Sequence, residues 1–172
     1  SQIFVVSTDA MDGYWPQFSL ANYVDLIEEH AFGNFRNLLE AVTLSPAMGD
    51  YLSMRGSRKA DAQGRQPDEN YAREVMQLFT IGLYELNPDG TQKLVNGQPD
   101  ETYTNDDIVG LSRVFTGFSW AGPDKVNGRF FGNSNPAPDP DRDVKPMQSY
   151  PQHRSTLQKR FLAFRRFRQK AV

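Results

Sequence analysis

The chain has 172 residues, enough for one domain with a substantial core, and 38% of them are hydrophobic, which excludes a disordered composition. It contains no cysteine, which excludes disulfides and thiolate chemistry, and no apolar run long enough to cross a membrane. The net charge of −2 conceals an acidic body and a basic end, because residues 154–172 hold seven of the 19 Lys and Arg residues and no acidic residue. An acidic body repels phosphate, so we predict no nucleic-acid binding.

Three helices are predicted in the first third of the chain, because apolar residues recur there at helical spacing behind good capping residues. A loop over 9–18 precedes them. The expected caps and extents are Ser19 for a helix over 20–32 that ends at Gly33, Asn34 for the next helix, and Ser45-Pro46 for a short helix to about Leu52.

The main helix is predicted from Pro67 to Gly82, with an apolar arc on one side. Its opposite face carries Asn70, Arg73 and Glu74, followed by Gln77 and Thr80. This dense polar cluster on the 68–81 helix is the first candidate site.

A β-hairpin or extended loop is predicted over 83–103, with turn signals that include Asn96-Gly97. Thr104 followed by Asp107 resembles a capping box and starts a helix that runs toward Gly117. Residues 122–151 are rich in Pro, Gly, Asn and Asp and predict no regular element. The expected fold class is therefore mainly α: an irregular helical domain with a small hairpin near 83–103.

The polar cluster has three interpretations. Asn70, Arg73 and Glu74 form a buried structural network, or ordinary helix surface, or a ligand or catalytic site. In the last case Glu74 is the acid/base or metal ligand, and Arg73 binds an anion. The structural network is the interpretation that the residues favour.

The two histidines differ in context. His30 lies at the edge of an apolar helix stripe, which predicts a partly buried ring satisfied by a neighbour. His153 follows Pro151 in an irregular region, where a binding role is more plausible. Two histidines without cysteine make a zinc site weak, so we predict no metal and no cofactor. The alternating acids Asp139, Asp141 and Asp143 lack the spacing of an EF-hand, which leaves a solvated acidic loop as the expectation and an irregular calcium site as the alternative.

Several stretches of the sequence resemble one bacterial family, the "domain of unknown function 1800" family. They follow one another in order from about residue 1 to 153, and the long one at 67–79 is the most specific. The stretches are HAFGNFR at 30–36, LSPAM at 44–48, PDENYAREVMQLF at 67–79, YTNDD at 103–107, RVFTG at 113–117 and YPQH at 150–153.

The resemblance implies a mostly helical, exported bacterial protein that is longer than this chain at both ends. It also implies a co-encoded sulfatase-like protein as partner, and it supplies no catalytic residue. We expect 1–153 to be part of a single helical domain. We interpret 154–172 as a basic tail of the kind that a frameshift or truncated gene model produces. The N-terminal residues lack the features of a signal peptide.

Three functions remain open from the sequence. A structural or partner protein of the cell envelope predicts an Arg73–Glu74 cluster that is internally paired, with no cleft beside it. A hydrolase-type enzyme that uses Glu74 predicts an open pocket at the cluster. A carbohydrate- or polymer-binding module predicts exposed aromatic rings, the candidates being Trp15, Trp120 and Tyr103.

Overall fold

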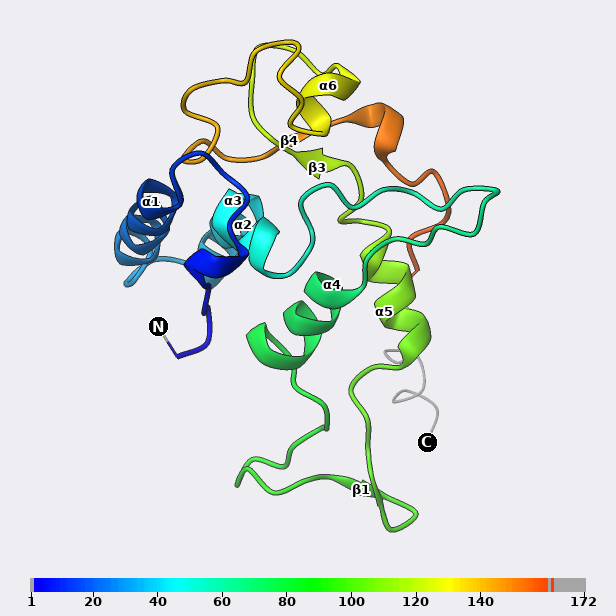
Figure 1. The fold of residues 1–172 in the computed structure, drawn as a ribbon. Coiled ribbons are helices and arrows are strands. Elements are labelled where there is room, and N and C mark those ends of the chain that lie inside the picture. The colour runs from blue at the N-terminus through cyan, green and yellow to red at the C-terminus, as the bar shows by residue number, and fades with distance from the viewer. Residues whose placement is uncertain (1, 161, 163–172) are drawn as a thin grey trace.

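The computed structural model describes residues 2–160 and 162, so most of the predicted basic tail lies outside the described residues. The described chain is mostly helical, as predicted, with two small antiparallel strand pairs and a fair share of loop. Figure 1 shows most of the helices grouped around the middle of the molecule, with an arm, residues 83–103, that extends away from them and carries strand β1 (Leu94–Val95). Among the described helices none is long and apolar enough to cross a membrane.

The N-terminal helices lie side by side, and their bounds are largely as predicted. A 3-10 turn, η1 (Thr8–Ala10), leads into α1 (Pro16–Glu29), α2 (Phe35–Leu44) and α3 (Pro46–Tyr51).

The start of α1 was predicted wrongly, because the helix begins at Pro16 and Ser19 lies inside it. Proline is favoured in the first turn, where its missing N–H is not needed. The Asn34 cap is confirmed, since its side chain accepts a hydrogen bond from the backbone N–H of Arg36. Ser45 occupies the predicted cap position of α3, but its hydroxyl makes no capping hydrogen bond.

The predicted main helix is shorter than expected and changes its winding. It consists of α4 (Asn70–Glu74) followed directly by a π-helical turn, η2 (Val75–Phe79). A π turn adds a residue per turn and is found often at functional sites. The wider turn changes the angular positions of the residues after Glu74 relative to an ideal α-helical wheel.

The arm comprises residues 83–103, and the predicted hairpin is confirmed within it. Strands β1 (Leu94–Val95) and β2 (Gln98–Pro99) pair antiparallel across the Asn96-Gly97 turn. Both turn residues have positive φ, 53° and 77°, as a type I′ turn requires. The single bridge of Tyr84 with Glu101 extends this pairing toward the helices, and the bridge of Leu86 with Gln92 closes a second turn within the arm.

The next helix, α5 (Asn105–Ser112), begins with the predicted capping box between Thr104 and Asp107. Beyond it, short elements appear where the sequence predicted none. They are α6 (Asn127–Phe130), strands β3 (Phe118–Ser119) and β4 (Gln148–Ser149), which pair antiparallel, and a 3-10 turn, η3 (Pro151–His153). Such short elements contain too few residues to show a period, which is why the prediction was wrong.

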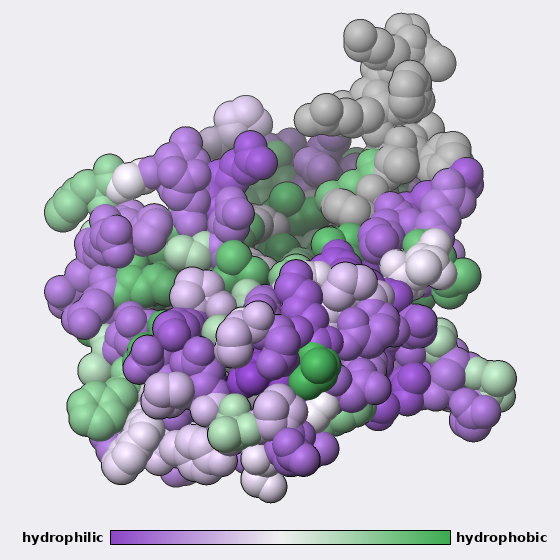
Figure 2. Space-filling view, turned by 90° about the horizontal axis from the view of Figure 1, so that it is seen from above, coloured by the Kyte–Doolittle hydropathy of each residue, from purple (hydrophilic) through white to green (hydrophobic). Residues whose placement is uncertain are grey.

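Two clusters of buried apolar side chains hold these elements together. The larger cluster joins α1, α2 and α3 to the main helix, and Tyr71 packs edge-on against Phe115 within this region. The smaller cluster lies between α4 and α5 and includes Ala72, Met76 and Ile108. From above, Figure 2 shows a mostly hydrophilic surface with hydrophobic side chains in separate patches.

Candidate functional site

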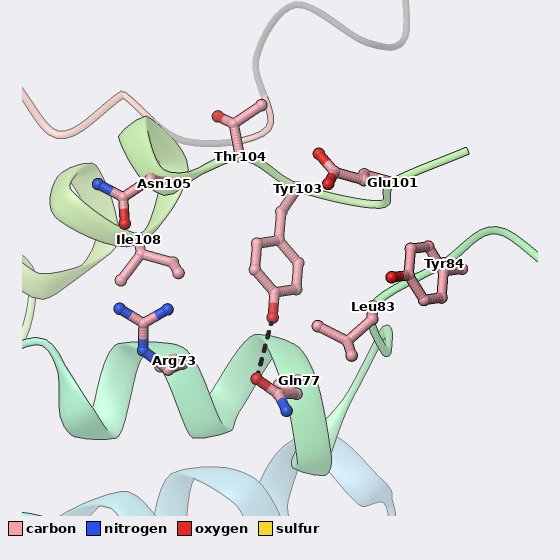
Figure 3. A pocket seen from close by; sticks show the side chains of 9 residues that line it. All are labelled: Arg73, Gln77, Leu83, Tyr84, Glu101, Tyr103, Thr104, Asn105 and Ile108. Carbon is pink, nitrogen blue, oxygen red and sulfur yellow. Dashed lines mark hydrogen bonds between the residues drawn. The ribbon is translucent and has the colours of Figure 1, made fainter. Parts of the chain in front are cut away.

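A cleft of about 190 Å³ lies where α4, the base of the arm and the start of α5 meet. Its size is below the range of roughly 300–1,000 Å³ that holds drug-sized ligands, so it suits a group the size of one side chain. Figure 3 shows the lining residues converging from these segments: Arg73, Gln77, Leu83, Tyr84, Glu101, Tyr103, Thr104, Asn105 and Ile108.

Arg73 supplies the positive charge of the cleft. Its side chain is 42% exposed, and its guanidinium contacts Glu69 at 3.4 Å, one turn earlier on the helix. An exposed pair at this spacing contributes only a few tenths of a kcal/mol. Figure 3 shows the guanidinium pointing toward Ile108 and Asn105 at the opposite wall. The weak pairing leaves Arg73 suited to contact a ligand group in the cleft.

Tyr103 forms the back of the cleft. Its ring is buried, and its hydroxyl donates a hydrogen bond to Gln77 Oε1 at 3.4 Å. Burial raises the pKa of this hydroxyl above its ordinary value, and the carboxylates of Glu74 and Glu101 raise it further, whereas Arg73 lowers it. Tyr103 therefore remains protonated near neutral pH and acts as a hydrogen-bond donor.

Asn70 and Glu74 of the predicted cluster lie outside this cleft, whereas Gln77 lines it. Asn70 is exposed at the start of α4, where its backbone N–H bonds to Asp68. Glu74 is not among the residues that line the cleft, and its Oε2 is buried without a hydrogen-bond partner among the described residues. Asn70, Arg73 and Glu74 therefore do not form the internally paired network that the structural interpretation predicts, and a cleft does lie beside Arg73.

The two histidines occupy separate places away from Arg73. His30 Nδ1 lies 3.0 Å from the carbonyl oxygen of Leu26 on its own helix, so Nδ1 carries the proton and donates. His153 stacks on Phe130 with ring centroids 3.8 Å apart, and its Nε2 bonds to Asn127. Burial, followed by the charges of Arg58, Lys59 and Arg65, holds the pKa of His153 below its ordinary value.

The three aromatic candidates for a carbohydrate platform do not share a surface. Trp120 is 2% exposed and Tyr103 is 8% exposed, so neither ring presents a face for stacking. Trp15 is exposed and contacts Phe18 edge-on. The predicted set of exposed rings is therefore wrong for two of its three members.

The acidic loop uses its carboxylates internally. Asp139 and Asp141 both pair with Lys145, and Asp143 accepts a hydrogen bond from the backbone N–H of Trp15. Within the described part of the chain, no group of three or more His, Asp or Glu side chains is placed to hold a metal ion. Of these contacts, only that of Asp143 connects the loop with a distant segment, the start of α1.

The sequence predicted some of the residues that line the cleft and did not predict the others. Arg73 and Gln77 are four residues apart on one helix, which is a signal that periodicity detects. Tyr84, Glu101 and Asn105 come from the arm and from α5, and no spacing in the sequence connects them with Arg73. The bridge between Tyr84 and Glu101 is a tertiary pairing that depends on the register of the arm.

Comparison with known proteins identifies a family. The family model described as "Protein of unknown function (DUF1800)" matches residues 1–171, which confirms the resemblance seen in the sequence motifs. The match continues beyond residue 153, where those motifs end. No curated protein matches the chain. No solved structure matches it either.

Proposed function

Since this chain belongs to the DUF1800 family of proteins of unknown function, we propose from its geometry that it is a recognition module that binds a partner protein. One observation carries the proposal: a polar cleft the size of one side chain lies beside an arm with exposed aliphatic side chains. Those side chains are Leu83, Leu86, Leu94 and Val95. Exposed apolar groups next to a polar anchoring point are typical of protein interfaces.

The cleft suits an uncharged polar group that both donates and accepts hydrogen bonds. Arg73 and Asn105 offer N–H donors on one side, and the Glu101 carboxylate offers an acceptor on the other. The opposite charges of Arg73 and Glu101 favour a dipolar group without net charge, such as the carboxamide of Asn or Gln. Such a side chain on the partner would enter the cleft while the arm covers the partner's surface.

The family resemblance supplies the proposed setting. It supports an exported protein that acts as a partner protein in the cell envelope of a bacterium, and the cleft beside Arg73 takes the place of the closed, internally paired cluster that we predicted for this role. It also supports the co-encoded sulfatase-like protein as the partner. The arm and the cleft together provide the docking surface for that protein.

Titration of the sulfatase-like protein by calorimetry tests this proposal. We expect saturable binding that Arg73→Gln and Leu94→Ser each weaken about tenfold or more, because an interface Arg and a central apolar contact carry much of the binding energy. Arg36→Gln is the matched control, since Arg36 is exposed on α2, outside the cleft and arm. Equal affinity of all three variants overturns the assigned surface, and no binding by the parent chain overturns the partner.

A hydrolase-type enzyme is the second candidate function, and one observation favours it. The Glu74 carboxylate has a buried, unpartnered oxygen and lies directly before a π-helical turn. Glu74→Gln is expected to abolish any hydrolysis of a chromogenic substrate panel without loss of the melting transition. Loss of that transition assigns Glu74 a structural role instead.

A further inference from the structure

The chain after η3 runs along one side of α5 as a strap, which comprises residues 155–160 and 162. The backbone N–H of Ser155 donates a hydrogen bond to Thr116 Oγ1 at 2.8 Å, and Arg113 Nη1 donates one to the carbonyl oxygen of Gln158, also at 2.8 Å. Figure 1 shows this segment, at the red end of the colour bar, descending beside α5. The described part of the predicted basic tail is therefore attached to the helical group.

The strap crosses α5 at Gly110, where the two backbones are in direct contact. A Cβ atom at residue 110 would collide with the backbone carbonyl group of Arg160. Glycine is unfavourable in the middle of a helix relative to alanine, but only glycine permits this close approach. The residue therefore trades helix propensity for contact with the strap.

The last described contact of the strap lies at the first turn of α5. The backbone N–H of Leu162 donates a hydrogen bond to Asp107 Oδ1 at 2.6 Å. The contacts with the strap therefore fall at residues 116, 113, 110 and 107, a spacing of three that keeps them on one side of the helix. Because they follow one another in reverse chain order, the strap runs antiparallel to α5.

This last contact connects the strap with the wall of the cleft described above. Asp107 accepts the Leu162 hydrogen bond through Oδ1, while its Oδ2 caps Thr104, which lines the cleft. The Leu162 side chain packs against the smaller apolar cluster, to which the cleft residues Tyr103 and Ile108 belong. Docking of the strap and the position of this wall are therefore coupled through Asp107 and through the packing of Leu162.

The strap is held more weakly than the helix that it covers. The side chains of residues 156–160 are exposed, and none of them forms an ion pair with a described residue. Leu162 has a positive φ of 54°, which is strained for a residue that carries a side chain. Segments with few buried contacts open locally at a lower free energy than the core does. The strap is therefore able to detach while α4 and α5 remain folded.

We propose that the strap is a latch that controls the cleft. When it is docked, it fixes the α5 wall of the cleft in the binding position, and when it is detached, it frees that wall. A group bound in the cleft and the docked strap stabilise each other, because coupling between two sites is reciprocal. The role in binding rests on the function proposed above, whereas the coupling of strap and wall rests on the contacts alone.

Gly110→Ala in the full chain tests the latch, because the added methyl group displaces the Arg160 carbonyl while alanine itself favours the helix. We expect trypsin to cleave after Lys159 and Arg160 about tenfold faster, since cleavage follows the population of the detached strap. Hydrogen exchange of residues 103–108 is expected to accelerate as well, whereas alanine beneath an inert covering would slow it. An unchanged cleavage rate, or faster cleavage without faster exchange at 103–108, overturns the proposal.

Two further variants separate the latch from a general loss of stability. Leu162→Ser removes the apolar anchor of the strap and is expected to reproduce both changes without a substitution in α5. Val109→Ala is the matched control, since it also introduces alanine into α5, but Val109 belongs to neither apolar cluster and to none of the strap contacts. Equal acceleration by Val109→Ala, or none by Leu162→Ser, overturns the proposal.

The calorimetric titration described above, repeated with Gly110→Ala, separates the latch from the proposed function. We expect this variant to bind the partner protein about tenfold more weakly than the parent chain does. Equal affinity of the two proteins overturns the control of binding by the strap. No binding by the parent chain overturns the proposed function instead, and the exchange at 103–108 then decides by itself whether strap and wall are coupled.

Discussion

The protonation of His153 makes the stability of the folded protein depend on pH. Its ring stacks on Phe130 and bonds to Asn127, and burial with three nearby cations holds its pKa below the usual value of 6.5. The unfolded chain therefore binds a proton at higher pH than the folded chain does. The stability that the neutral ring contributes is present above about pH 6.5 and is lost as the pH falls through that value toward the folded pKa.

We expect the free energy of unfolding to fall between about pH 7.5 and pH 5.5, and His153→Gln to reduce that fall. Urea unfolding of both proteins at several pH values measures the difference. The folded pKa is available directly from an NMR titration of the His153 ring. A ring that titrates at or above 6.5 in the folded protein contradicts the argument.

At the scale of single elements, the sequence predicted those features that depend on residues close to one another in the chain. The Asn34 cap, the Asn96-Gly97 turn and the Thr104–Asp107 box each act within a few residues, and all three are present. The π turn at Val75 was missed, because it depends on packing rather than on composition. The β3–β4 pair was also missed, since it joins segments about 30 residues apart through two residues each.

The residues of the candidate site likewise fall into those that the sequence predicted and those that it did not. Arg73 was predicted from helical spacing and lines the cleft, whereas Glu74, its neighbour in the same pattern, does not. Adjacent residues project about 100° apart around an α-helix, so Glu74 leaves a different side of α4 than Arg73 does. Gln77, four residues after Arg73, lines the same cleft. Glu101 and Tyr84 reach the cleft only because the arm returns to the helices in one register, which no short sequence motif encodes.

The capping box is expected to stabilise the N-terminal end of α5. Asp107 Oδ2 accepts hydrogen bonds from the Thr104 backbone N–H and hydroxyl, both at 2.8 Å. Thr104→Ala removes the hydroxyl and is expected to cost about 1 kcal/mol of unfolding free energy, or roughly 2–4 °C in melting temperature. Thr104→Ser keeps the hydroxyl and serves as the control in the same thermal scan. Equal losses for the two variants contradict the capping role.

At the scale of the whole molecule, one aromatic ring connects segments that are distant in the sequence. Two guanidinium groups lie over the Trp120 ring, that of Arg55 at 4.1 Å and that of Arg142 at 4.3 Å from its centroid. Arg55 is in turn paired with Asp50 and with Asp12 near the N-terminus. The stack therefore connects the N-terminal helical region with the loop that carries Arg142. Arg55 is hydrogen-bonded to both carboxylates, whereas the buried Arg142 Nε has no hydrogen-bond partner among the described residues.

The two tryptophans make this fastening measurable, because each single variant leaves the other as the only tryptophan fluorophore. Trp120→Ala is expected to lower the free energy of unfolding by about 3–5 kcal/mol, since it removes a ring that is 2% exposed. Trp15→Ala is the matched control and is expected to cost about 1 kcal/mol or less, because Trp15 is 53% exposed. Urea unfolding followed by circular dichroism measures both losses. In fluorescence, the Trp15→Ala variant should emit at shorter wavelength than Trp120→Ala, and the reverse order, or equal losses of stability, contradicts the central position of Trp120.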